Sequence, residues 1–120
     1  MPWLKMMFQK LLVGMSYRFM RVVVMFDLPT ETSMDRRHYR WFRKFLIDEG
    51  FVMMQESVYT KICLNMHSVK KVEQNIRKNR PPKGIVQVMS ITEKQFASMK
   101  LVVGETDNVN VQSDERLIIL

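Results

Sequence analysis

Five apolar residues in succession, Val22 to Phe26, give the clearest β-strand signal in the chain. β-Branched side chains dominate this run, which predicts a strand buried on both faces. Asp27 follows the run, and Pro29 ends the strand because proline has no N–H to donate to a sheet. The pattern therefore predicts a buried strand that carries one carboxylate at its C-terminal tip.

A long amphipathic helix is predicted from about Ser33 to Glu49. Thr32 and Asp35 form a capping-box pattern at its start, and Gly50 is a typical residue just beyond a helix end. At about 100° per residue, two sides can be distinguished. The side predicted to be buried holds Met34, His38, Trp41, Phe42, Phe45 and Leu46. The opposite side holds Arg36, Arg37, Arg40, Arg43 and Lys44.

A hairpin and a second helix are predicted next. Residues 51–55 and 57–64 are typical of two short strands with little between them. In the second strand one buried and one mixed face are expected, because Val58, Thr60, Ile62 and Leu64 alternate with Tyr59, Lys61 and Cys63. The helix spans 66–79, has Asn65 or Ser68 as its cap, and ends before the prolines of 81–82. Its narrow apolar stripe is Val69, Val72 and Ile76.

Three further elements and a tail complete the prediction. Residues 84–91 form a strand, Thr92–Gln95 a short capped turn, and Leu101–Val103 a brief fifth strand closed by Gly104. Residues 105–115 are polar and are expected to be an exposed linker. The apolar run that follows should pair with a sheet edge, in this subunit or another, because an unpaired apolar strand invites aggregation. This run is Arg116, Leu117, Ile118, Ile119 and Leu120.

The order β-α-β-β-α-β predicts an α+β, ferredoxin-like fold over residues 15–104, with an antiparallel sheet and both helices on one face. The narrow core and the extra C-terminal strands favour a face-to-face homodimer, with 105–120 as a linker and C-terminal strand outside the ferredoxin-like domain. Residues 1–14 repeat apolar positions at helical spacing but do not match this pattern. We expect them to be an extension outside the fold, from an upstream start codon, or alternatively a docking helix for a partner.

Composition narrows the class of protein. The 120 residues suit one domain, and 47% hydrophobic with 26% charged residues is typical of a globular protein. The single Cys63 excludes an internal disulfide, and one Cys with two distant histidines excludes a zinc finger. Cys63 is expected to be a packed residue rather than a reactive thiol. No apolar run has the length of a membrane helix, and a reducing cytoplasm is the expected location.

The net charge of +7 favours polyanionic partners. The basic side of the first helix carries no interleaved acid, which favours phosphate contact over a merely solvated surface. A second basic group surrounds the Pro-Pro turn. The candidate nucleic-acid-binding residues are Arg36, Arg37, Arg40, Arg77, Lys78, Arg80 and Lys83.

Several of these segments together resemble the CRISPR-associated Cas-two family, most closely its type II branch. The resemblance covers Met15 to Leu120. It rests on Phe26-Asp-Leu-Pro29, Tyr39-Arg-Trp-Phe-Arg-Lys-Phe45, Gly50-Phe51, Gln55-Glu-Ser-Val-Tyr59 and Thr92-Glu-Lys-Gln-Phe96. It implies the same fold, and homodimers in which the last strand of each chain completes the partner's sheet. It also implies that the dimer joins two dimers of the Cas-one integrase, holds captured duplex DNA by its backbone, and serves spacer insertion into the CRISPR array.

The same resemblance implies a role for Asp27. In the family this aspartate is a catalytic metal ligand that faces its own copy across the dimer axis, and some members are reported as Mg²⁺- or Mn²⁺-dependent endonucleases. Magnesium often takes only one or two carboxylates, so one Asp from each subunit is sufficient. No neighbouring His or Lys has an obvious general-base role, and Phe26 stands where many members carry tyrosine. An ordinary Asx turn is the alternative for Asp27.

Two other functions stay open at this point. The protein could act primarily as a metal-dependent endoribonuclease or endodeoxyribonuclease. An RNA-binding module of the RRM type shares the βαββαβ order, but it stacks bases on aromatic residues of its central strands. The first strand here is aliphatic apart from Phe26, so this reading ranks third.

Overall fold

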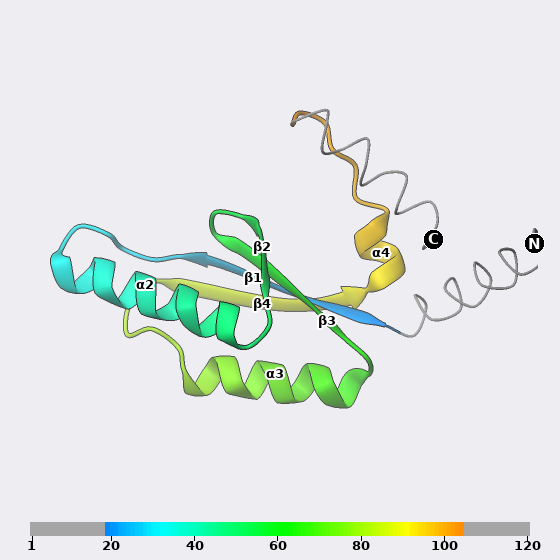
Figure 1. Ribbon diagram of the computed structural model, residues 1–120, viewed down its shortest axis with the longest axis horizontal. Coiled ribbons are helices and arrows are strands. Elements are labelled where there is room, and N and C mark those ends of the chain that lie inside the picture. Colours follow the sequence, from blue (N-terminus) through cyan, green and yellow to red (C-terminus); the bar gives the residue numbers. More distant parts are fainter. Residues whose placement is uncertain (1–18, 105–120) are drawn as a thin grey trace, which may run out of the picture.

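The computed structural model describes residues 19–104, which form four strands and three helices around one core (Figure 1). Their order is β1 (Met20–Asp27), α2 (Ser33–Asp48), β2 (Val52–Gln55), β3 (Val58–Cys63), α3 (Met66–Lys78), β4 (Ile85–Thr92) and α4 (Glu93–Ala97). The predicted extension at 1–14 and the predicted linker and strand at 105–120 lie outside the described residues. Within the described range, no helix combines the length and apolar character needed to cross a membrane.

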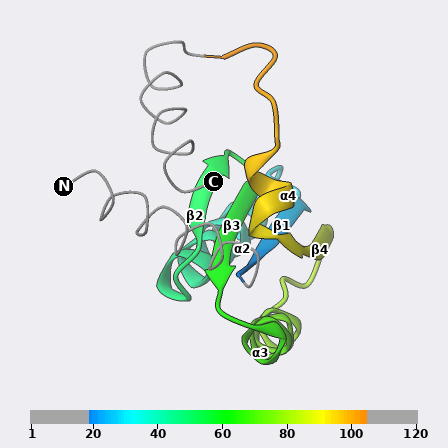
Figure 2. The ribbon, with the colours of Figure 1, turned by 90° about the vertical axis from the view of Figure 1, so that its right-hand side faces the viewer.

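The strands form one antiparallel sheet in the order β2-β3-β1-β4. β1 is central and pairs with β4 along its whole length, from Met20 opposite Thr92 to Asp27 opposite Ile85. Helices α2 and α3 lie on the same side of the sheet, as the two views show (Figures 1 and 2). The predicted ferredoxin-like arrangement is confirmed.

The core lies between the sheet and the two long helices. Val22, Val24 and Phe26 of β1 belong to it, and the Phe26 ring centroid lies 5.4 Å from that of Phe42 on α2. Val23 points to the opposite face and is also buried, because β3 and β4 flank it. The predicted two-sided burial therefore holds over the middle of β1.

Helix ends follow the sequence signals closely. The Thr32 hydroxyl accepts from the Asp35 backbone N–H at 3.0 Å, and the Asp35 carboxylate accepts from the Thr32 N–H at 3.2 Å. Gly50 has a φ of +98°, as expected just beyond a helix. The side chain of Asn65 accepts from the Ser68 N–H, which identifies Asn65 as the α3 cap.

The predicted buried side of α2 is only partly right. Phe42 and Leu46 are fully buried, whereas Met34 and Trp41 are 54% and 48% exposed. The six residues of this side, five apolar ones and His38, span a wider arc than the sheet can cover. The covered arc is centred on Phe42, and Met34 and Trp41 fall at its edge.

The faces of β3 also differ from the prediction. Tyr59 and Cys63 are buried beneath the helices, while Ile62 is 46% exposed on the open face of the sheet. The register explains this, because Tyr59 lies opposite Val24, which faces the core. Burial raises the pKa of the Cys63 thiol, which fits a packed residue.

The predicted fifth strand at Leu101–Val103 is wrong. No strand forms there, and Val102 is 92% exposed. Both sides of the central strand are already paired, and α4 leads the chain away from the sheet (Figure 1). A three-residue apolar run without a neighbouring edge has no partner for its backbone hydrogen bonds.

Candidate carboxylate site and nucleic-acid interface

Asp27 is the last residue of β1, and its side chain is exposed. Leu28 beside it is buried and fixes the strand end in the core. Gly84 lies directly against this end: a Cβ added there would be 2.7 Å from the Asp27 carbonyl oxygen and 2.8 Å from Leu28 Cδ2. The loop before β4 is thus held tightly against the strand tip that presents the carboxylate.

Asp27 supplies part of what a divalent cation needs as a ligand set. Within residues 19–104, no three His, Cys, Asp or Glu side chains are grouped to hold a metal ion. Mg²⁺ binds through one or two carboxylates and keeps several waters, so an exposed aspartate at a strand end is a suitable ligand. A second copy of Asp27 would raise the ligand count to two, which is the arrangement that the resemblance implies.

The cations of α2 differ in their surroundings. Arg36 donates from Nη1 to the carbonyl oxygens of Thr30 and Glu31 at 3.1 and 3.0 Å, so it fixes the loop before the helix. Arg37 and Arg40 are exposed, and neither forms a hydrogen bond or ion pair with any residue between 19 and 104. Arg37 and Arg40 are therefore available to an external anion.

The turn after α3 holds the second basic group. Arg80 donates to the Arg77 carbonyl oxygen at 3.1 Å, and Lys78 is exposed. Lys83 Nζ lies 3.8 Å from the Asp35 carboxylate. The pKa of Asp35 is lowered, mainly by the hydrogen bond from the Thr32 backbone N–H, with Lys83 as a smaller cause.

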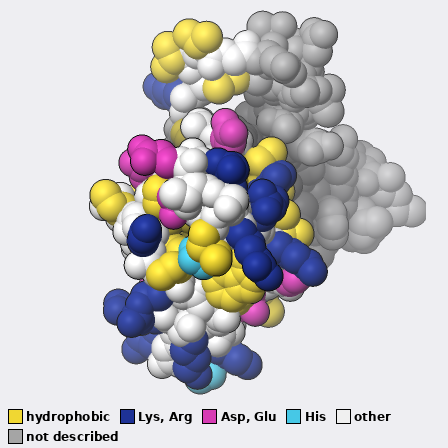
Figure 3. Space-filling model, turned by 90° about the vertical axis from the view of Figure 1, so that its left-hand side faces the viewer, with side chains coloured by type: hydrophobic (Ala, Val, Ile, Leu, Met, Phe, Trp, Pro, Cys, Tyr) yellow, Lys and Arg dark blue, Asp and Glu magenta, His cyan; other side chains and the backbone are white. Residues whose placement is uncertain are grey.

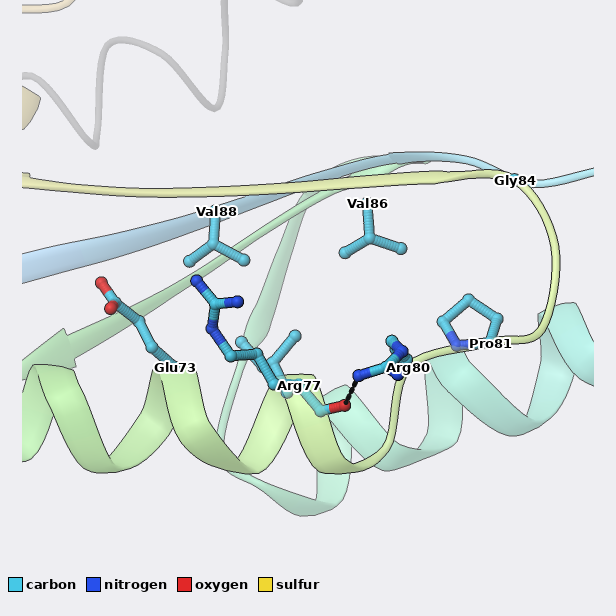
Figure 4. A pocket seen from close by; sticks show the side chains of 8 residues that line it. Glu73, Arg77, Arg80, Pro81, Gly84, Val86 and Val88 are labelled. Atoms are coloured by element: carbon cyan, nitrogen blue, oxygen red, sulfur yellow. Dashed lines mark hydrogen bonds between the residues drawn. The ribbon is translucent and has the colours of Figure 1, made fainter.

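A groove between α3 and β4 brings two of these cations together. Its volume is about 400 Å³, Val86 and Val88 of β4 line one wall, and Ile76 contributes from α3. Figure 4 shows the Arg77 side chain extending from α3 toward Val88, with Arg80 at the turn. The groove has apolar walls, and its charged lining residues are Arg77, Arg80 and the carboxylate of Glu73.

A second hollow lies where α2 meets the Pro-Pro turn. Its volume is about 410 Å³, and we call it the Trp41 hollow. It is lined by Met34, Arg37, His38, Trp41, Arg80 and Pro82. Figure 3 views this end of the molecule and shows hydrophobic side chains in the middle, with Lys and Arg side chains on either side.

The structure therefore brings together only part of the predicted basic set. Arg80 lines both hollows, so it joins Arg77 on one side to Arg37 on the other. Arg40 and Lys78 line neither hollow, and Arg36 and Lys83 contact this chain itself.

Trp41 is the residue that sequence reasoning missed. Its helical periodicity placed it in the core, yet it lines the surface between cations. The available signal was local: Trp41 follows Arg40 directly and lies four residues from Arg37, so it borders the basic side of the helix.

Comparisons with known proteins agree with this architecture. Residues 20–99 match the family model described as CRISPR associated protein Cas2. The chain is 46% identical over 101 residues to the CRISPR-associated endoribonuclease Cas2 of Treponema denticola, covering 84% of this chain and 100% of that protein. It is 48% identical to the protein of the same name from Lacticaseibacillus rhamnosus, covering 83% and 100%. A solved structure titled "Crystal structure of cas2" shares the fold, with a TM-score of 0.51, 18% identity, and coverage of 74% of this chain and 91% of that one.

Proposed function

This chain belongs to the Cas2 family of CRISPR-associated proteins, and on that premise we propose that it is a scaffold for spacer acquisition. It works as a homodimer that bridges two dimers of the Cas-one integrase and holds duplex DNA by its backbone. The observation that carries this proposal is the convergence of Arg37, Arg77 and Arg80 on two adjoining hollows. Phosphate contacts hold a duplex in register without reading its sequence, which suits captured DNA of arbitrary sequence.

The open face of the sheet supports the homodimer. It lies opposite α2 and α3 and carries the exposed apolar side chains of Val52, Ile62, Ile85 and Met89. Several exposed apolar side chains on one sheet face are a feature of interaction sites in globular proteins. In a dimer with its two-fold axis through this face, the same residues of the two copies would cover each other.

The position of β4 supports strand exchange between the two copies. β4 is an edge of the sheet, and among the described residues only β1 pairs with it. Its eight residues offer a second row of backbone donors and acceptors. The run Arg116–Leu120 of the other copy would pair with this edge and cover it.

A metal-dependent nuclease activity is the second candidate function. The relatives from T. denticola and L. rhamnosus are named endoribonucleases, and the exposed Asp27 is a suitable Mg²⁺ or Mn²⁺ ligand. A bound cation would polarise a phosphodiester and lower the pKa of a water molecule. Asp27 would hold that cation together with its copy from the other subunit. Assignment to the type II branch stays a prediction.

Charge reversal tests the duplex-binding proposal. We expect the double variant Arg37→Glu and Arg80→Glu to bind duplex DNA at least about tenfold more weakly. The slope of log affinity against log salt concentration should become shallower by about two, because two phosphate contacts are lost. Lys70→Glu is the matched control, because Lys70 is an exposed α3 cation that lines neither hollow. Equal affinities for the double variant and the wild type would exclude these residues as DNA contacts.

Substitution of Asp27 separates the scaffold from the nuclease. Asp27→Ala and Asp27→Asn should retain co-purification with the Cas-one integrase and spacer integration, while metal-dependent cleavage is lost. Loss of integration would make the carboxylate part of the acquisition mechanism. Unchanged cleavage would show that the nuclease activity lies elsewhere.

A further inference from the structure

The Trp41 hollow combines apolar and basic side chains. Trp41 and Met34 are about half exposed, and Pro82 adds a third apolar surface. Arg37 and Arg80 stand beside them, and no carboxylate lines the hollow. The lining therefore suits a ligand that is both flat and apolar in one part and negatively charged in another.

Trp41 is held in place by aromatic contacts. Its ring stacks on that of Phe45 with a centroid distance of 6.2 Å and an interplanar angle of 15°. Phe45 in turn stacks on the fully buried Phe42 at 6.1 Å and 27°. A ring fixed in this way loses little conformational freedom when a ligand stacks on it.

The two arginines select among the ligands that an exposed tryptophan could bind. Arg37 forms no hydrogen bond or ion pair with any described residue, and Arg80 uses one of its five N–H donors on the Arg77 carbonyl oxygen. Both retain donors for phosphate oxygens. Aromatic rings flanked by arginines are the usual contacts of unpaired nucleotides.

We propose that the Trp41 hollow binds an unpaired nucleotide, with Trp41 stacking on the base and Arg37 and Arg80 contacting the flanking phosphates. A base inside a duplex is covered on both faces by its neighbours, so a stacking site selects single-stranded ends. This inference rests on the proposed duplex-holding function and deepens it. The basic residues hold the backbone, and the hollow distinguishes a duplex with an unpaired end from a blunt one.

Tryptophan fluorescence tests the proposal directly. The chain has two tryptophans, so Trp3→Phe leaves Trp41 as the reporter. Three DNA probes are compared: a blunt duplex, the same duplex with a short single-stranded extension, and that extension without its bases. We expect the base-containing extension to quench Trp41 and to bind about five- to tenfold more tightly than the abasic one, although both carry the same charge.

Two variants complete the test. Trp41→Leu should remove the preference for the base-containing extension and leave blunt-duplex affinity unchanged. Ile47→Ala, at another half-exposed apolar residue of α2, should change neither. Retention of the preference in Trp41→Leu would overturn the proposal, and so would an equal loss of affinity for all three probes. Loss of Cas-one co-purification with the preference intact would instead identify the hollow as a protein contact.

The two proposals fail in different ways. A protein that binds duplexes but does not distinguish the two extensions refutes the hollow as a nucleotide site and leaves the scaffold standing. A protein that binds no duplex, but whose Trp41 is quenched by a single-stranded oligonucleotide more than by an abasic one, refutes the scaffold and retains the nucleotide site.

Discussion

Asp35 does two things at once, because it caps α2 and lies beside Lys83. Its pKa is lowered from the ordinary value of 3.8, chiefly by the Thr32 N–H. A carboxyl group with a lowered folded pKa stabilises the protein above pH 3.8 and loses that contribution as the pH falls through the folded pKa.

We therefore expect Asp35→Asn to be less stable than the wild type at neutral pH, with the difference shrinking below pH 3.8. Urea unfolding across the acid range measures this. Asp48→Asn, at an exposed carboxylate in the last turn of α2, is the control for the removal of one negative charge from this helix. If the free energies of unfolding of Asp35→Asn and the wild type differed by the same amount at every pH, the lowered pKa of Asp35 would be contradicted.

Gly84 connects the basic turn to the strand tip. Its φ is +93°, and an added Cβ would overlap Asp27 O at 2.7 Å. We expect Gly84→Ala to lower the free energy of unfolding by roughly 2–3 kcal/mol, from backbone strain plus the displacement of rigid backbone. Gly50→Ala meets only the flexible Lys61 side chain at 3.5 Å and should cost about 1 kcal/mol. Equal losses in urea unfolding would show that the contact with Asp27 is unimportant.

At the scale of elements, the side chain of Arg21 links α4 to the sheet, beside a backbone hydrogen bond from the Glu93 N–H to the Phe19 carbonyl oxygen. Arg21 donates to both carboxylate oxygens of Glu93, lies 4.2 Å from the Phe96 ring centroid and donates to the Thr60 hydroxyl. We expect Glu93→Ala to lower the free energy of unfolding by about 1–3 kcal/mol, because a partly buried guanidinium loses its partner. Glu56→Ala, at an exposed turn, should change it by less than about 0.5 kcal/mol. A loss below that level for Glu93→Ala would show that α4 is held by other contacts.

The elements differ in how far the sequence predicts them. Helix starts were predictable because a cap is a local interaction: Thr32 with Asp35, and Asn65 with Ser68, are only three positions apart. The faces of β3 were not, because the burial of Tyr59 depends on its register with β1. Leu101–Val103 shows the same limit, since an apolar run becomes a strand only beside a free edge.

At the scale of the whole molecule, one candidate site was predictable from the sequence and the other was not. The position of Asp27 at a strand tip followed from a local pattern, the apolar run and the proline after it. The Trp41 hollow did not, because Arg37 and Arg80 lie far apart in the sequence and meet only when the turn after α3 packs beside α2. Side-chain periodicity predicts which face of a helix is buried against its sheet. It does not predict which residues of a distant turn will pack beside that helix.

The exposed apolar residues on the open sheet face make the proposed homodimer directly testable at the scale of the whole molecule. Met89 lies on this face opposite the buried Val23 and is 45% exposed. In a face-to-face dimer, Met89→Glu would place an unpaired carboxylate in the interface of each copy, at a cost of roughly 3 kcal/mol per charge. We expect sedimentation to show a monomer at concentrations where the wild type is a dimer, with unchanged circular dichroism. Ile47→Glu, on the exposed surface of α2, should remain dimeric, and a Met89→Glu variant that does the same would place the interface on another surface.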